Sequence, residues 1–227
     1  MRKCVLVSLA LLIGWGTAFS QDEGSEGGYF DAGDMAFEVT GSPFGNDAWS
    51  SSSSSGKLLS FGSLRARYAV TTNIVPRLGI NVGLSNEQDT PDAVTNRSSY
   101  LVRPGCEYHF RVENGFRSYA ALDVLVGQGF SSYESTTSYS IDGATSVNIA
   151  NRTATNKGYF LIGVGIGVGA EYHLNSRFYI GTEVGFNLAQ SKMNEVFVDG
   201  ELFQESTKNS SVTMNTLNAI RIGFKFL

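Results

Sequence analysis

The alternation of residue types over residues 159–174 constrains the fold of this chain more than any other feature. The apolar positions of this segment are Phe160, Ile162, Val164, Ile166, Val168, Ala170, Tyr172 and Leu174, and glycine fills most of the positions between them. A period of two is typical of a β-strand, whereas a helix would lose about 1 kcal/mol for each interior glycine relative to alanine. The segment is therefore predicted to be a strand with one apolar face and one small or polar face.

Seven further segments show the same alternation, and the connections between them differ in length. The eight predicted strands are 33–41, 58–70, 77–85, 98–110, 116–130, 158–174, 177–189 and 212–227. Long polar loops are expected at 42–57, 86–97, 131–157 and 190–211, and short turns at 71–76, 111–115 and 175–176. Long loops at one end and short turns at the other are typical of outer-membrane barrels. The sequence thus predicts an all-β fold, an eight-stranded antiparallel up-and-down transmembrane β-barrel with both termini on the periplasmic side.

The composition of the two strand faces separates a membrane barrel from a soluble one. A soluble barrel of the lipocalin type has its apolar residues inside, and a membrane barrel reverses the faces. The non-apolar face here carries glycine, alanine, asparagine and tyrosine with few charges, whereas a water-exposed face is normally rich in charged residues. Aromatic residues also gather near both ends of the apolar face, as membrane interfaces select. These features favour the membrane barrel.

The first twenty residues indicate export. Two basic residues precede a short apolar run, and the small residues Ala18 and Ser20 stand where a signal peptidase would cleave before Gln21. We therefore expect a signal peptide, a periplasmic segment and a barrel at residues 1–20, 21–32 and 33–227. A membrane anchor is the alternative, although the run is shorter than the roughly 20 residues of a spanning helix. Removal of the signal leaves 15 basic against 21 acidic residues, which argues against a nucleic-acid partner.

Two hairpins share an internal repeat at positions that would face the barrel axis. In each hairpin, one strand ends in glycine, glutamate and histidine at alternate positions, and the next begins with Arg-x-Tyr followed by an acidic residue. Charges inside a narrow barrel must pair, because an isolated buried charge is very costly. We therefore predict a structural polar network in the lumen that comprises Arg65, Arg67, Arg103, Glu107, His109, Arg117, Tyr119, Asp123, Glu171, His173, Arg177, Tyr179, Glu183, Arg221 and Lys225.

The two histidines of this set allow a second interpretation. His109 and His173 each lie two residues from a glutamate on the same strand face, so that either pair could bind a metal or act as acid and base. Both pairs are expected near the short turns, and the structural interpretation is favoured. No catalytic residue, metal or cofactor is predicted. Pro104 cannot donate a hydrogen bond to the sheet and predicts a bulge or gap in its strand.

The strand and turn around Pro104 also resemble a known family. Residues 101–110 read LVRPGCEYHF and residues 116–121 read FRSYAA. A Pro-Gly-x-Glu-Tyr strand, a short turn and an aromatic returning strand resemble the outer-membrane β-barrel domains of small OmpA/OmpX-like proteins. Residues 220–227, IRIGFKFL, resemble the last strand that the barrel-assembly machinery reads. The resemblance implies an outer-membrane location in a Gram-negative bacterium, with that machinery and the membrane lipids as partners.

The sequence specifies the role of this barrel less clearly than its location. Because loops on a rigid scaffold carry recognition, we expect a non-enzymatic structural or interaction role, with a partner contacted through loops 42–57, 86–97, 131–157 and 190–211. The alternation over 195–203 predicts that two strands extend above the membrane. A narrow porin-like channel for small solutes is the alternative function. A third hypothesis, an enzyme acting on membrane lipid, needs a Ser, His and acid cluster at the long-loop rim, where neither histidine is expected.

Overall fold

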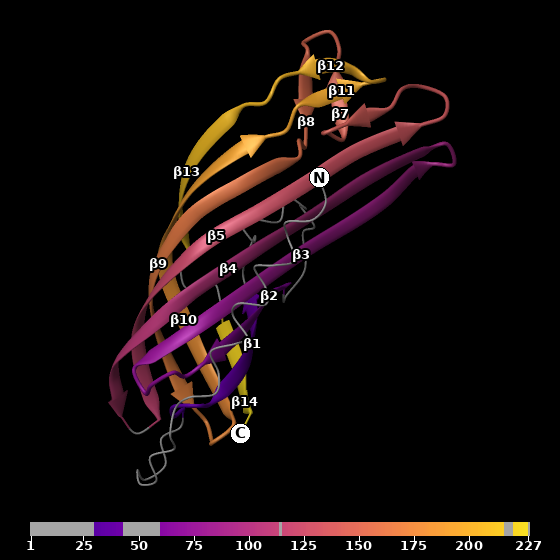
Figure 1. Cartoon of the computed structure of the whole chain (residues 1–227). Helices are drawn as coiled ribbons and strands as arrows, with labels where there is room; N and C mark the ends of the chain where they lie inside the picture. The colour runs from indigo at the N-terminus through magenta and orange to yellow at the C-terminus, as the bar shows by residue number, and fades with distance from the viewer. Residues whose placement is uncertain (1–29, 43–59, 114, 216–219, 227) are drawn as a thin grey trace.

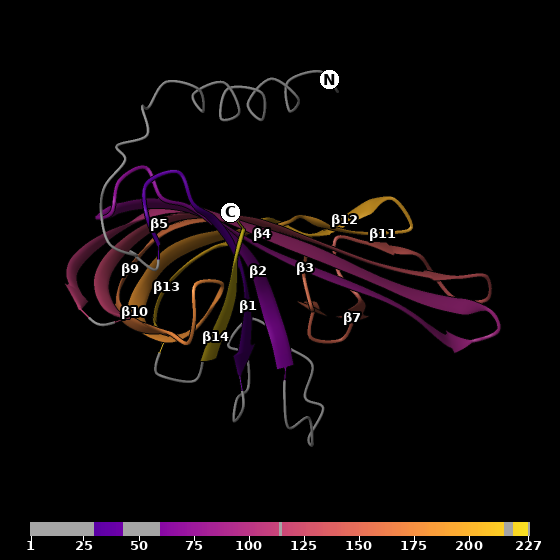
Figure 2. The same cartoon turned by 90° about the horizontal axis from the view of Figure 1, so that it is seen from below.

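Eight segments of the chain pair side by side and close into a ring. The computed structural model describes residues 30–42, 60–113, 115–215 and 220–226. The strands of the ring are β1 (Met35–Ser42), β2 (Ser60–Tyr68), β3 (Ile74–Thr90), β4 (Ala93–Glu113), β5 (Phe116–Ser135), β9 (Tyr159–His173), β10 (Phe178–Met193) and β14 (Ile220–Phe226). Each strand is antiparallel to its neighbours, and β14 pairs with β1 to complete the circle (Figure 1, Figure 2). The predicted eight-stranded antiparallel up-and-down architecture is confirmed.

The two faces of the barrel wall are inverted relative to a soluble protein. Ile166, near the middle of β9, is 56% exposed, whereas Glu171 and Arg221, which point inward, are each 1% exposed. The same pattern holds round the ring, so that apolar side chains cover the outside and charged side chains fill the inside. The hydrocarbon of a bilayer stabilises such an outer surface, and water does not. The predicted orientation of a transmembrane barrel is therefore confirmed.

Aromatic side chains lie on the outer surface near both ends of the apolar band. Toward the long-loop end the exposed aromatic residues include Tyr100, Phe130, Phe160 and Phe186, and toward the short-turn end they include Phe37, Tyr108, Phe110, Phe116, Tyr172, Phe178 and Phe226. Membrane interfaces select two belts of this kind. Within the described part of the chain, no helix is long and apolar enough to cross a bilayer.

Tight connections join the strands at the short-turn end. Among the described residues they comprise 69–73 and 174–177, and Gly115 lies directly before β5. Asn175 shapes the last of these turns, because its side-chain oxygen accepts hydrogen bonds from the backbone amides of Arg177 and Phe178, both at 2.8 Å. Turns this short fix the register of the strands that they join.

Pro104 interrupts the pairing between two strands, as the sequence predicts. β4 and β5 pair at Val102 and Val126 and again at Gly105 and Asp123, in one continuous register, and no pair is recorded between these positions. Proline has no amide hydrogen to donate to the ladder. The consequence is a local gap without a bulge, and β4 remains paired with β3 on its other side.

Two of the described strands, β13 and β14, pair with β10 at the eighth position of the wall. β10 pairs with β14 over Phe178–Thr182 and with β13 (Lys208–Asn215) over Gly185–Lys192. The sequence predicted a single strand over 212–227, so that β13 begins four residues earlier than expected. Residues 208–211 are polar and were assigned to a loop. Pairing with β10, which the apolar periodicity of one strand does not reveal, makes them part of the sheet.

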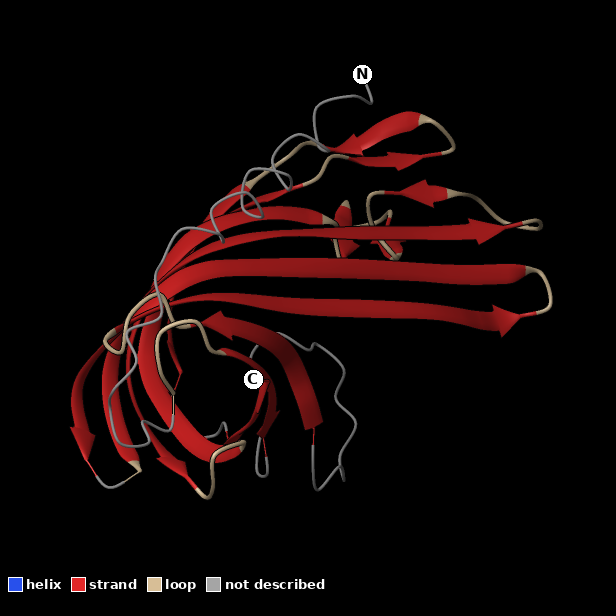
Figure 3. Ribbon diagram, turned by 60° about the horizontal axis from the view of Figure 1, so that its bottom comes forward, coloured by secondary structure: helices blue, strands red, loops and turns tan. Residues whose placement is uncertain are grey.

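The wall of the barrel is much taller on one side than on the other. The last recorded pair between β2 and β3 is Leu64 with Ile80, but β3 continues to Thr90 in pairing with β4. β3, β4 and β5 thus form a sheet that projects well beyond β1 and β2 (Figure 3). The loop predicted at 86–97 is therefore a hairpin of polar strands, which is a correction. The loop predicted at 42–57 lies almost wholly outside the described residues.

The predicted loops 131–157 and 190–211 contain further strands and pack together into one unit, which we call the lobe (residues 136–158 and 194–207). Its strands are β6 (Ile141–Asp142), β7 (Ser146–Asn148), β8 (Thr153–Thr155), β11 (Val196–Val198) and β12 (Glu201–Gln204). β6 pairs with both β5 and β11, and β11 pairs with β12, so that the lobe continues the sheet of the barrel. The two strands predicted within 195–203 are confirmed as β11 and β12.

Candidate functional site: the lumen and the lobe

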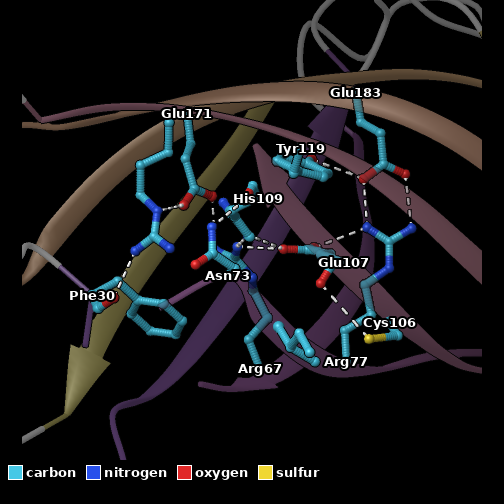
Figure 4. Close-up of polar contacts among 12 residues, drawn as sticks. Phe30, Arg67, Asn73, Arg77, Cys106, Glu107, His109, Tyr119, Glu171 and Glu183 are labelled. Carbon is cyan, nitrogen blue, oxygen red and sulfur yellow. Dashed lines mark hydrogen bonds and ion pairs between the residues drawn. The ribbon is translucent and has the colours of Figure 1, made fainter. Parts of the chain in front are cut away.

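Charged side chains from all eight strands of the ring meet inside the barrel. Figure 4 shows a part of this set around Arg67 and Arg77. Alternate residues of each strand face inward, and the set that we call the lumen network consists of Arg65, Arg67, Arg77, Arg103, Arg117 and Arg221 with Glu38, Glu107, Asp123, Glu171 and Glu183. Each member lies within 4 Å of a group of opposite charge. Six cations therefore face five anions, and the desolvation of each is offset by close partners.

Arg67 holds three carboxylates together near the short-turn end. Its Nη1 donates hydrogen bonds to Glu171 at 2.8 Å and to Glu38 at 3.1 Å, and its Nη2 donates to Glu107. The guanidinium is 0% exposed. A planar guanidinium offers several N–H groups in a fixed fork, which an ammonium cannot do. Without Arg67, three buried carboxylates would face one another with much of their compensation lost.

Arg77 performs the same function for the next layer of the lumen. Its Nε and Nη2 donate to the two oxygens of Asp123, each at 2.7 Å, in a bidentate pair. Its Nη1 donates to Glu183 at 2.6 Å and to Glu107 at 2.9 Å. Arg77 was not among the predicted residues, although it has the same parity as Gly79 in its strand. The period of two was therefore sufficient to find it.

Glu38 joins the first and last strands of the ring. Arg221 of β14 donates to it through Nε at 3.1 Å and through Nη2, and Arg67 of β2 binds it from the other side. The Tyr179 hydroxyl donates a further hydrogen bond to Glu38 at 2.8 Å. Glu38 is 0% exposed. Glu38 was not predicted as a lumen residue, because the strand over 33–41 was predicted from its apolar residues alone.

The two repeated tyrosines pack over glycines on the neighbouring strands. Tyr119 is the cross-strand partner of Gly169, and Tyr179 is the partner of Gly223. A Cβ atom at either glycine would overlap the tyrosine ring or its hydroxyl. The hydroxyls reach carboxylates, that of Tyr119 donating to Glu183 at 2.9 Å. The Arg-x-Tyr repeat of the sequence thus corresponds to a repeated fit of ring over glycine.

The two histidines lie beside their glutamates, as the sequence predicts. His109 Nε2 lies 3.1 Å from Glu107 Oε2, and His173 Nε2 lies 3.4 Å from Glu171 Oε1. Each imidazole also stacks on a tyrosine of the repeat, at centroid distances of 5.1 Å and 4.9 Å. Both histidines are buried, and no group of three or more possible metal ligands is found within the described residues. The geometry supports a structural role for both pairs.

The remaining predicted lumen residues occupy the rims of the network. Arg103, which is only partly buried, lies 3.3 Å from Asp123. Lys225 pairs with Asp34, a residue that was not predicted, at 2.9 Å at the short-turn end. Arg177 was predicted to belong to the lumen network. It is exposed instead. It lies in the turn before β10, where its carbonyl accepts a hydrogen bond from the Lys225 amide, and Lys225 is the residue that points inward there.

Phe30 closes the lumen at the short-turn end. Its ring is 0% exposed and lies between two guanidinium carbons, 5.1 Å from that of Arg67 and 5.5 Å from that of Arg117. Arg117 donates to the Phe30 carbonyl at 2.7 Å and to the Thr72 carbonyl at 2.5 Å. Phe30 belongs to the segment 21–32 that was expected to be periplasmic. Its side chain instead fills the mouth of the barrel, and nothing in the sequence pattern indicated this.

Apolar side chains cover the lumen network on its other side. Leu101, Leu125 and Leu161 point inward from β4, β5 and β9 and form a buried cluster. The lobe has a separate core of Ile141, Ala144 and Val196, against which Tyr133, Tyr139, Val147, Ala154 and Phe203 pack. Among the described residues, the charged lumen network therefore lies between an apolar cluster around Phe30 at the short-turn end and the leucine cluster toward the long-loop end.

The chain resembles known proteins in structure and not in sequence. No model of a protein family matches the sequence, and no curated protein matches it. Among solved structures the chain is similar to outer membrane protein OprG from Pseudomonas aeruginosa, with 14% identity over 87% of this chain and 97% of that chain and a TM-score of 0.43. Outer Membrane Protein W of E. coli is 14% identical over 86% of this chain and 99% of that chain, with a TM-score of 0.42. Ail of Yersinia pestis is 13% identical over 86% of this chain and 99% of that chain, with a TM-score of 0.38. Because these TM-scores are below 0.5, the fold assignment rests on strand register and burial alone.

Proposed function

We propose that this chain is a non-enzymatic outer-membrane protein with a closed lumen, and that the lobe is its working surface. The apolar outer wall between two aromatic belts supports the membrane location. With an even number of strands, both ends of the chain leave the ring on the short-turn side. The N- and C-termini then lie in the periplasm, and the lobe lies outside the cell.

The filled lumen is the observation that carries this proposal. Phe30, the lumen network and the leucine cluster block the axis in succession, and passage of an ion would break several buried ion pairs at once. Breaking such pairs is strongly unfavourable. We expect the purified protein to show no discrete conductance steps in planar lipid bilayers. Regular steps from the wild-type protein would contradict the proposal and favour the porin-like alternative.

The lobe supports an interaction role because it is already folded. A surface held by its own core loses less conformational entropy on binding than a flexible loop. It exposes two apolar side chains, Ile149 at 63% and Leu202 at 51%, on a part of the molecule that water would surround. Pull-down from detergent-solubilised outer membranes should recover a partner with the wild-type chain. Recovery should fall for I149S/L202S, while the heat-unfolding midpoint of the barrel stays unchanged.

Cysteine labelling tests the orientation directly. In a C106S background, L202C should react with a membrane-impermeant maleimide on intact cells, because Leu202 lies in the lobe. S176C, in the exposed β9–β10 turn, should react only after the outer membrane is permeabilised. Labelling of S176C but not L202C on intact cells would reverse the proposed orientation. Labelling of neither site, before or after permeabilisation, would contradict the proposed exposure of both.

A further inference from the structure

Two lysines lie opposite each other on the outer wall. Lys192 of β10 is the cross-strand partner of Lys208 of β13, and such partners project from the same face with Cβ atoms about 5 Å apart. Both residues are exposed, and no carboxylate of the described residues lies within 4 Å of either ammonium. Like charges in this arrangement repel each other. An external anion would relieve the repulsion.

On β10 and β13 the outward residues change from charged to polar to apolar over three rows that run from the lysines toward the middle of the barrel, while β9 is apolar in all three rows. The rows across β9, β10 and β13 are Phe160, Lys192 and Lys208, then Ile162, Gln190 and Ser210, then Val164, Leu188 and Val212. Successive rows are about 7 Å apart, because each residue of a strand advances by ~3.4 Å. A membrane lipid has the same order of parts, with an anionic head, polar linkages and acyl chains.

A groove in the outer wall lies at the two lower rows. It has a volume of about 590 Å³, and its apolar lining includes Val124, Ile162, Val164, Leu188 and Val212. Gln190 and Ser210 line it as well, in the row next to the lysines. The groove is shallow and open along the outer wall, so that a ligand in it would keep one side against the surrounding lipid. The apolar end of the groove faces the hydrocarbon in the proposed orientation, so that an acyl chain is the ligand part that matches it.

We propose that this surface binds a phosphate-bearing lipid of the outer leaflet, with its phosphate between Lys192 and Lys208 and an acyl chain in the groove. The inference rests on the membrane location proposed above. Two ammonium groups supply several donors for the phosphate oxygens, and basic residues at a membrane surface attract anionic lipid heads. A free phosphate would leave the groove uncovered, and a protein partner would have to enter the hydrocarbon to fill it.

Lipid retention by the full-length protein in detergent, measured by native mass spectrometry, tests the site. Dipalmitoyl phosphatidic acid should be retained by the wild type, and dipalmitoyl glycerol, which lacks the phosphate, should not. K192Q/K208Q should weaken retention at least about tenfold, and K192R/K208R should preserve it. R177Q removes one exposed positive charge at the opposite end of the barrel and should have no effect. Equal retention by the wild type and K192Q/K208Q would overturn the proposal.

A second variant separates a lipid site from an anion site. V164F should fill the groove, so that retention of phosphatidic acid falls while competition by inorganic phosphate is unchanged. Retention unaffected by V164F, with inorganic phosphate displacing the lipid fully, would assign the lysines to a free anion and overturn the lipid assignment. Insertion into phosphatidylcholine vesicles, measured by protease protection, distinguishes the two levels of failure. Loss of insertion contradicts the membrane location, whereas insertion without selective retention contradicts the lipid site alone.

Discussion

The lumen network and the lobe are stabilised in opposite ways within one continuous sheet. The interior of the ring is charged and depends on contacts between distant strands, such as Glu38 with Arg221. The lobe is held by a small apolar core, in which Ile141 and Val196 are buried. In the proposed orientation lipid surrounds the first region and water surrounds the second. The ring therefore buries charged side chains, which lipid solvates poorly, and the lobe buries apolar side chains, which water solvates poorly.

The comparison explains why polar strands can continue the barrel beyond the membrane. The same period of two runs along β4 and β5, but the outward residues change from apolar to polar, as Asn96 and Ser132 illustrate. The backbone pairing does not change at this point. A barrel strand can therefore pass from lipid into water by a change of side chains alone, and the lobe is built on the projecting strands.

The largest expected effect is the loss of Arg67. R67M removes the partner of Glu38, Glu107 and Glu171 while keeping a long side chain. Because unpaired buried charges are strongly destabilising, the free energy of unfolding should fall by about 3–5 kcal/mol. Urea titration of the protein in lipid vesicles would measure this. R177M, at an exposed position, is the matched control and should cost less than about 0.5 kcal/mol. Equal midpoints for both variants would show that the network does not stabilise the barrel.

The second-largest loss of stability is expected where the ring of Tyr179 packs over Gly223. G223A places a methyl group against the ring of Tyr179, and overpacking of this kind costs about 1–3 kcal/mol. G79A is the control, because a Cβ atom there meets Arg103 at an ordinary distance of 3.4 Å. The heat-modifiable shift on gels should occur at lower temperature for G223A only. Equal behaviour would mean that the ring can move aside.

A change in the lobe should leave the barrel unaffected. V196A removes buried apolar atoms and should cost the lobe about 1.5 kcal/mol. Hydrogen exchange in β6 and β11 should become faster, while the urea midpoint of the barrel stays the same. I149A, at an exposed position of the lobe, should change neither quantity. A lower barrel midpoint for V196A would mean that the two regions unfold as one unit.

The smallest effect is expected at the rim of the lumen. D34N breaks the pair between Asp34 and Lys225 at the mouth of the barrel, where the Asp34 side chain keeps 15% of its exposure, and loss of this single pair should cost about 1 kcal/mol. Salt at about 1 M should reduce the difference from the wild type, because ions in the adjoining water screen the charge of Asp34. The destabilisation of R67M should persist in the same salt. A common salt dependence would mean that water reaches the lumen network.

Strand parity was sufficient to predict most of the lumen network. Glu107, Asp123 and Glu171 lie where alternation placed them, and the two missed residues, Glu38 and Arg77, share the same inward parity. The partners could not be predicted, because they depend on the register of strands far apart in the sequence. The repeat did not predict the position of Arg177 correctly. Arg177 lies in the turn before β10, and the turn, not the alternation of the strand, sets the direction of its side chain.

Phe30, which closes the lumen, and the lobe were harder to predict, for different reasons. Phe30 lies before the first strand, in a short segment that is mostly polar and has no apolar periodicity. The lobe consists of polar strands whose pairing depends on β5 and on one another. Only the alternation over 195–203 indicated order in this region. Local alternation therefore identified both faces of the barrel wall, where the surroundings select every second residue, but it did not identify the elements that lie at either end of the wall.

The contact between Glu38 and Arg221 also bears on how the ring is completed. These residues stand on the first and last strands, so that their charges meet only when the final seam is sealed. With the seam open, Glu38 would keep Arg67 of β2 and Arg221 would keep Glu183 of β10, but each would lose its partner across the seam. Closure therefore completes the neutralisation of both buried charges and favours the finished cylinder over the open one.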